Sequence, residues 1–183
     1  MKIVVAITGA SGVIVAKKLL ENLKEHETHL IITENAKKVI SYELPNEKLE
    51  KLASFFYDEN DLNSRLSSSS FIADAMVIVP CSMKTLAAIA NGFSENLVSR
   101  CAENFLKCNR KLIVVPRDTP LSLSAIENMR KLKLAGAIIL PMNVAYYHKP
   151  KSVDDITNFF VGKILDMLNL ENKLYRRWKE NDI

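Results

Sequence analysis

Residues 2–23 read KIVVAITGASGVIVAKKLLENL, and this stretch decides the fold. The run 2–8 is almost continuously apolar and rich in β-branched side chains, which is typical of a strand buried on both faces of a sheet. Gly9-Ala10-Ser11-Gly12 follows as a turn, and residues 13–23 then carry the pattern of a helix. The stretch therefore predicts a strand, turn and helix of the kind from which parallel α/β sheets are built.

The same alternation of strand and helix continues along the chain. We expect further strands at 28–33, 75–80, 111–116 and 136–141, and further helices at 35–43, 83–90, 95–107, 121–133 and 152–168. Residues 44–70 are more polar, with a short helix expected at 47–54 and four serines at 67–70. Since parallel strands need crossover helices, this order predicts a doubly wound, mostly parallel open sheet, a Rossmann or flavodoxin-like three-layer sandwich.

The chain of 183 residues is long enough for one domain, which we place at 1–168. Residues 169–183 are expected to form a C-terminal tail helix. Trp178 stands there beside Arg176 and Arg177, a combination typical of interfaces, so we expect the tail to pack between subunits or over a site. A frayed surface helix is the alternative.

Composition excludes several classes of function. The net charge of +4 is spread along the chain, which argues against a nucleic-acid-binding protein. No stretch approaches the roughly 18 apolar residues of a membrane span, and the start has the pattern of a strand rather than a signal peptide, so we expect a cytoplasmic protein. Cys81, Cys101 and Cys108 lack CxxC spacing, which predicts reduced structural thiols and no zinc site.

Ligands of such sheets bind beyond the carboxyl ends of the strands, so the residues after each strand are candidates for chemistry. The turn Gly9–Gly12 offers glycines, helix N–H groups and the Ser11 hydroxyl to a phosphate. It lacks the GxGxxG dinucleotide pattern, and a turn without a ligand is the alternative. After the third strand, Cys81, Ser82 and Met83 could line a flat ring or simply begin a helix.

Charged and aromatic residues follow the last two strands. Arg117 beside Asp118 suits a phosphate clamp with a proton relay, whereas a surface ion pair is the alternative. Tyr147 could bind phosphate or donate a proton, and His148 next to it is more typical of an ordinary loop histidine. Arg100 and Lys107 share one helix face, which is either part of an anion pocket or a solvated stripe.

Together these segments resemble the flavin prenyltransferases, the UbiX-like family, from Ile3 to about Leu168. The most specific stretch is MVIVPCSMKTLAAIANG at 76–92. It is accompanied by Asn96-Leu97 with Arg100, by VPRDTPLS at 115–122 and by YHKP at 147–150. Several long motifs in one order make the resemblance specific.

The resemblance implies a reaction. Enzymes of this family transfer the five-carbon unit of a dimethylallyl (mono)phosphate to N5 and C6 of reduced FMN, without a metal. The prenylated FMN serves as cofactor for a partner decarboxylase. The family also implies a homo-oligomer, a dodecamer, with sites at subunit contacts.

The resemblance also assigns roles to residues. Gly9, Ala10, Ser11 and Thr33 would hold the phosphate side of the flavin, and Ser82 and Met83 would contact its rings, with Arg100 and Arg117 near the cofactor. The prenyl phosphate would be bound by Lys107, Arg117, Tyr147 and Lys163. Glu43 would lie at the prenyl site and Ser68 near flavin N5, and the catalytic set would be Asp118, Glu43, Ser68 and Tyr147.

The chain departs from the family pattern at several positions. Asp118 stands where a glutamate is usual, Lys163 where an arginine is usual and Ser69 where a glycine is usual. These changes leave an FMN-binding protein without catalysis as one alternative. A flavin-dependent cysteine decarboxylase is another, although no histidine lies between residues 30 and 147. Glu43, Asp118 or the departing phosphate could each accept the proton.

Overall fold

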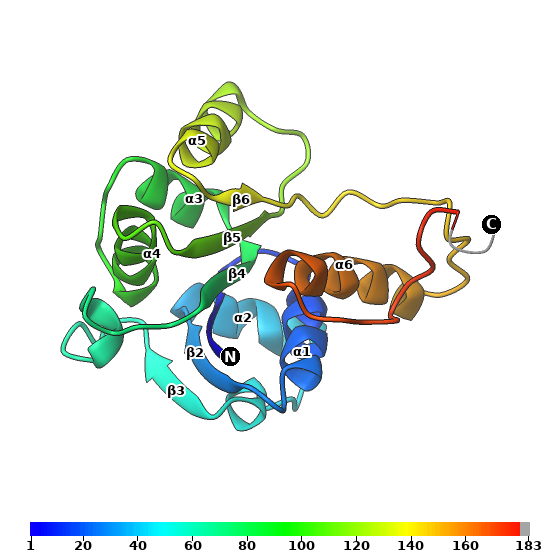
Figure 1. Cartoon of the computed structure of the whole chain (residues 1–183), viewed down its shortest axis with the longest axis horizontal. Coiled ribbons are helices and arrows are strands. Elements are labelled where there is room, and N and C mark those ends of the chain that lie inside the picture. The colour runs from blue at the N-terminus through cyan, green and yellow to red at the C-terminus, as the bar shows by residue number, and fades with distance from the viewer. Residues whose placement is uncertain (180–183) are drawn as a thin grey trace.

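The computed structural model describes residues 1–179 and shows one twisted sheet between two layers of helices (Figure 1). Six parallel strands lie in the order β3-β2-β1-β4-β5-β6. They are β1 (Lys2–Ile7), β2 (Glu27–Ile32), β3 (Phe55–Asp58), β4 (Ala75–Cys81), β5 (Lys111–Pro116) and β6 (Ile138–Ile139). The predicted doubly wound α/β class is therefore confirmed.

Three helices cover each face of the sheet. One face carries α1 (Val13–Asn22), α2 (Glu34–Glu43) and α6 (Val153–Leu168), and the other carries α3 (Met83–Ala90), α4 (Leu97–Lys107) and α5 (Leu123–Leu134). Alternate residues of β1 divide between the two layers: Ile3 and Val5 face the first core, and Val4 and Ala6 face the second. The continuous apolar run at 2–8 reflects this burial on both sides.

Most helices start at the carboxyl edge of the sheet because they follow a strand, whereas α4 follows α3. Thr33, Ser82, Asn96, Ser122 and Ser152 cap five helices, each accepting a hydrogen bond from the backbone N–H three residues on. The sixth, α1, begins after Gly12, whose φ of 101° lies in the left-handed region that favours glycine.

Four elements differ from the sequence predictions. The strand β3 was not predicted, and the helix expected at 47–54 is only a short 3-10 turn at Leu49–Leu52. The strand expected at 136–141 is limited to Ile138–Ile139. The tail helix expected at 169–183 is wrong over 169–179, which contain no helix, and residues 180–183 lie outside the described part.

The cysteines match the structural role expected of them. Cys81 and Cys101 are buried, and burial raises the pKa of both thiols, that of Cys101 to about 12. Cys108 is exposed and free. Among the helices of residues 1–179, none is both long and apolar enough to cross a membrane.

Candidate active site

A crevice opens at the carboxyl edge of the sheet between β1 and β4. The chain leaves β1 toward β2 on one side and leaves β4 toward β5 on the other, which makes this gap the point where ligands bind in doubly wound sheets. The crevice measures about 300 Å³. Its lining comprises Gly9, Thr33, Asn35, Glu59, Ser82, Lys84, Thr85, Glu95 and Asn96. The fold thus brings three predicted cofactor residues, Gly9, Thr33 and Ser82, into one cavity.

Thr8 is hydrogen-bonded to Ser82 of the crevice lining. Its hydroxyl donates to the carbonyl of Pro80 at 2.9 Å and accepts the N–H of Ser82 at 2.7 Å. The side chain is buried, so its bond to Pro80 is shielded from water, whereas its bond to Ser82 is only partly buried. Thr8 therefore fixes the last residue of the β1 run against the start of α3.

The starts of α2 and α3 reach the crevice, and each is capped by a hydroxyl that lines it. The Thr33 hydroxyl accepts the N–H of Ala36 at 3.2 Å, and the Ser82 hydroxyl accepts the N–H of Thr85 at 3.3 Å. Gly9 is required by packing, because a Cβ there would lie 2.6 Å from the Cβ of Asn35. Helix N-termini and hydroxyls at one crevice suit the phosphate of FMN.

Glu59 joins two helix starts across the crevice. Its carboxylate accepts the N–H of Glu34 at 2.5 Å and the side-chain amide of Asn96 at 2.7 Å. At the same mouth Lys84 pairs with Glu95 at 2.8 Å, and this hydrogen bond raises the pKa of Lys84. Sequence reasoning missed Glu59 because it follows the unpredicted strand β3, whereas Lys84, Thr85 and Asn96 lay within the quoted motifs.

The turn after β1 does not present all its N–H groups to the crevice. The Glu43 carboxylate, at the end of α2, accepts the N–H groups of Gly12 at 3.0 Å and Val13 at 3.1 Å. A carboxylate is favourable at a helix N-terminus, and here it occupies the position expected for the flavin phosphate. Ser11 is exposed and Ala10 is buried, so the phosphate-binding role of these two residues stays a prediction.

A second, smaller cavity of about 120 Å³ follows β5 and β6 at the same edge. Arg117 and Asp118 line it together with Met142. The N–H of Arg117 donates to the carbonyl of Cys81 at 3.2 Å, which ties this cavity to the end of β4. The expected clamp residues thus lie beside the crevice, with both side chains exposed.

Tyr147 lies in an aromatic cluster above α6. Its ring meets Trp178 edge-on with centroids 5.4 Å apart, and Phe159 is 6.2 Å away. His148 stacks on Phe159 at 4.9 Å, but both of its ring nitrogens are buried without a hydrogen-bond partner among residues 1–179, which differs from the ordinary loop histidine expected from the sequence. Lys163 lies on α6, with its ammonium 5.6 Å from the centre of the Tyr175 ring.

Lys107 and Ser68 lie at the opposite end of the molecule from the crevice. The helix α4 starts at the crevice with Asn96 and runs back over 11 residues, a rise of about 16 Å, to Lys107. Ser68 lies in the loop bound to this far end, where Asn104 donates to the Ser67 carbonyl at 2.9 Å. Arg100 occupies the second turn of α4, half-buried. Within a single chain, Lys107 and Ser68 therefore lie far from Arg117 and Tyr147.

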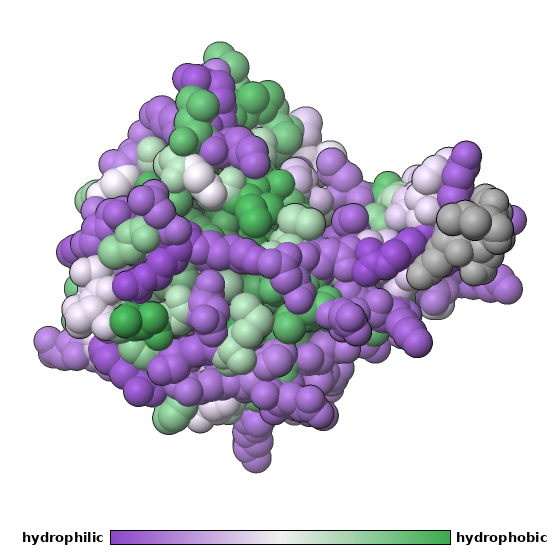
Figure 2. Space-filling model, in the orientation of Figure 1, coloured by the Kyte–Doolittle hydropathy of each residue, from purple (hydrophilic) through white to green (hydrophobic). Residues whose placement is uncertain are grey.

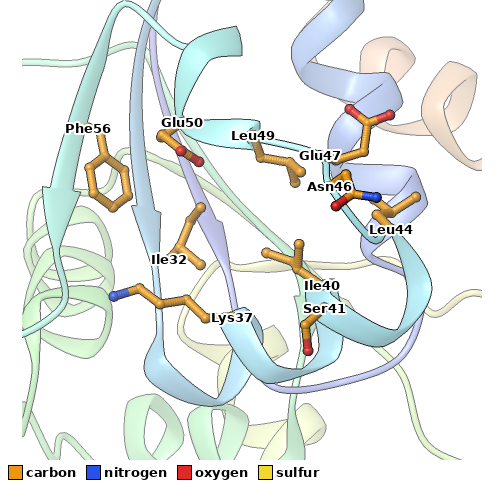
Figure 3. A pocket seen from close by; sticks show the side chains of 10 residues that line it. All are labelled: Ile32, Lys37, Ile40, Ser41, Leu44, Asn46, Glu47, Leu49, Glu50 and Phe56. Carbon is orange, nitrogen blue, oxygen red and sulfur yellow. The ribbon is translucent and has the colours of Figure 1, made fainter.

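Another pocket, of about 420 Å³, lies between α2 and the segment from η1 (Leu49–Leu52) to β3 (Figure 3). Ile32, Ile40, Leu44, Leu49 and Phe56 give it an apolar lining, with Lys37 and Glu50 at its margin. It contains none of the predicted site residues, so it is distinct from the crevice.

Comparison with known proteins gives concordant results. Residues 1–165 match the family model described as Flavoprotein. A flavin prenyltransferase UbiX of Methanocaldococcus jannaschii is 52% identical over 181 residues, covering 97% of this chain and 98% of that protein.

Two solved structures share the whole fold. The crystal structure of AnUbiX in complex with FMN and dimethylallyl pyrophosphate has a TM-score of 0.95 at 42% identity, covering 97% of both chains. The dodecameric FMN-dependent UbiX-like decarboxylase of Escherichia coli O157:H7 has a TM-score of 0.95 at 41% identity, covering 98% of this chain and 100% of that one.

Proposed function

The chain belongs to the flavoprotein family, among its UbiX-like flavin prenyltransferases, and from this premise we propose that it transfers a prenyl group from dimethylallyl monophosphate to reduced FMN. The observation that carries the proposal is the crevice at the strand switch, where Gly9, Thr33 and Ser82 meet as the family motifs imply. Near-complete coverage of a 52% identical flavin prenyltransferase supports the same activity.

Bound reduced FMN supplies the electron-rich N5 and C6 atoms that become prenylated. The chain's own residues bind the departing phosphate and move a proton. Arg117 and Tyr147 offer a cation and a phenol at the same edge of the sheet, which stabilises negative charge as the allylic C–O bond breaks. Asp118 lines the same cavity as Arg117, and Glu43, at the end of α2, accepts the N–H groups at the start of α1; these two carboxylates and the departing phosphate are the candidate proton acceptors.

The complete site requires more than one subunit. Lys107 and Ser68 lie at the far end of α4 and its neighbouring loop, so they serve the site of an adjacent copy rather than their own. Leu123 and Leu134 are exposed apolar side chains of α5, and the top of Figure 2, where Figure 1 places this helix, is partly hydrophobic, which suits such a contact. We place the homo-oligomer in the cytoplasm, with a decarboxylase as the consumer of its product.

The direct test is anaerobic incubation with reduced FMN and dimethylallyl monophosphate, followed by mass spectrometry of the bound flavin. A flavin that carries one added five-carbon unit is expected. Arg117→Ala should abolish the product, whereas Arg130→Ala, an exposed arginine of α5 paired with Glu127 at 2.9 Å, should not. Unmodified bound flavin with both the monophosphate and the pyrophosphate would leave an FMN-binding protein without this catalysis.

A further inference from the structure

The segment after α6 forms a strap rather than a tail helix. We use the name C-terminal strap for residues 170–179. Asn169 adopts a left-handed φ of 61° that ends α6, and the strap then runs back along this helix toward the loop at 141–152, as the red segment of Figure 1 shows. The strap therefore reaches from the amino edge of the sheet to the side where Tyr147 lies.

Asp166 anchors the strap to α6. Its carboxylate accepts the Tyr175 hydroxyl at 2.5 Å, the Arg177 guanidinium at 2.7 and 3.1 Å, and the Asn172 amide at 2.9 Å. The Asp166 side chain is only 13% exposed, so these charge-assisted bonds are largely shielded from water. Although burial opposes ionisation, the hydrogen bonds from Arg177, Tyr175 and Asn172 lower the pKa of Asp166 overall.

Gly162 supplies the slot into which the strap fits. A Cβ at this position would lie 2.4 Å from the Tyr175 ring and 2.9 Å from the side-chain oxygen of Asn172. The ring of Tyr175 is also flanked by the cations of Lys163 and Arg177, at 5.6 and 5.3 Å. Tyr175 is therefore held by its fit against Gly162, by the two neighbouring cations and by its hydrogen bond to Asp166.

The far end of the strap meets Tyr147. Three residues beyond the anchored Tyr175, Trp178 lies edge-on to Tyr147 at 5.4 Å and 90°. Residues 140–152 contain no helix or strand, so the Tyr147 backbone has little regular structure to hold it. The contacts of its ring with Trp178 and Phe159 therefore determine where its hydroxyl points.

We propose that Asp166 is a positioning residue for Tyr147: by holding Tyr175 and Arg177 it keeps Trp178 against the Tyr147 ring. Only the consequence for catalysis rests on the proposed function. The mechanical part, that Asp166 orders Trp178, stands on the contacts alone. It assigns a role to a carboxylate that lies outside both the crevice and the Arg117 cavity.

Trp178 is the only tryptophan of the chain, so its fluorescence reports on the strap directly. Trp178 is already 68% exposed, so the readout is the mobility of its indole: in the full-length protein, Asp166→Asn should lower the steady-state fluorescence anisotropy of Trp178 by about a third. In the transfer assay it should raise KM for the prenyl phosphate about tenfold, with FMN affinity unchanged. The matched control is Asp154→Asn, which removes a carboxylate of the same helix that pairs with Lys18 at 3.1 Å.

A double variant separates positioning from general damage. If Asp166 acts through Trp178, Asp166→Asn should raise KM no further in a chain that already carries Trp178→Ala. Tyr175→Phe keeps the ring against Gly162 and removes one hydrogen bond to Asp166. The same measurements on this variant test the proposal if Asp166→Asn folds poorly. Unchanged Trp178 anisotropy in both anchor variants, or fully additive KM effects, would overturn the proposal. The anisotropy result decides the mechanical part even if no prenyl transfer is detected.

Discussion

Thr8→Val removes one hydroxyl and keeps the shape of the side chain. In the wild type this hydroxyl bridges Pro80 and Ser82 at the crevice. The Pro80 carbonyl would retain the N–H of Thr8 at 3.2 Å. The N–H of Ser82 would lose its acceptor, and no other is present in residues 1–179, so the variant leaves one partly buried donor unsatisfied.

The expected cost follows from these contacts. Loss of a net hydrogen bond costs about 1 kcal/mol, and an unsatisfied, partly buried donor adds about 1–2 kcal/mol. The sum of about 2–3 kcal/mol corresponds to a fall in Tm of roughly 5–10 °C for a chain of this size. Because Ser82 begins α3 at the crevice, FMN affinity should fall as well.

The assay is thermal unfolding of the flavin-free protein at one fixed protomer concentration, followed by FMN titration. Thr8→Ser is the control, since it keeps the hydroxyl and should retain most of the stability and FMN affinity. A Tm for Thr8→Val within about 1 °C of the wild-type value would refute the reasoning, because the Ser82 donor would then have found another partner or water.

Three further outcomes are expected. Gly9→Ala should weaken FMN binding at least about tenfold in a fluorescence titration, because the alanine Cβ would lie 2.6 Å from the Cβ of Asn35. Asn35→Gly in the same chain should restore part of the FMN affinity. Burial lowers the pKa of His29 below 6.5, so the unfolded chain takes up the proton first as the pH falls. The urea concentration at the unfolding midpoint should therefore fall between about pH 7 and 5. An equally steep pH dependence of this midpoint in His29→Gln would exclude His29 as the cause. If each site takes Lys107 from one subunit and Tyr147 from another, co-refolded Lys107→Ala and Tyr147→Ala chains should regain roughly a quarter of wild-type activity by random mixing. No recovery would mean that the two residues act within one chain.

The strands predicted most accurately from the amino-acid sequence are those buried on both faces of the sheet. Residues 2–8 and 75–80 are continuous apolar runs because helices cover both sides of β1 and β4. The edge strand β3 escaped prediction because three of its four residues are exposed, which leaves no such run. The strand β6 is shorter than predicted because it pairs with β5 alone, through two residues.

The residues of the candidate site were likewise predicted only in part. Residues directly after β1, β2 and β4 were predicted to meet, and Gly9, Thr33 and Ser82 do line one crevice, since strand ends share one edge of the sheet. Glu59 was missed because its partners, the N–H of Glu34 and the amide of Asn96, are 25 and 37 residues away in sequence. The tail was assigned to a helix on composition, whereas hydrogen bonds to Asp166 hold it in an extended course that no local pattern encodes.

The fit between Gly162 and Tyr175 has an evolutionary consequence. A side chain at 162 and a large ring at 175 cannot coexist, because the first Cβ would already overlap the second residue. Neither position can change freely without the other, and the order of changes matters: a lineage must first lose the ring before it can replace the glycine. An alignment of relatives should therefore show these two columns varying as a pair, with intermediates that carry a small residue at both.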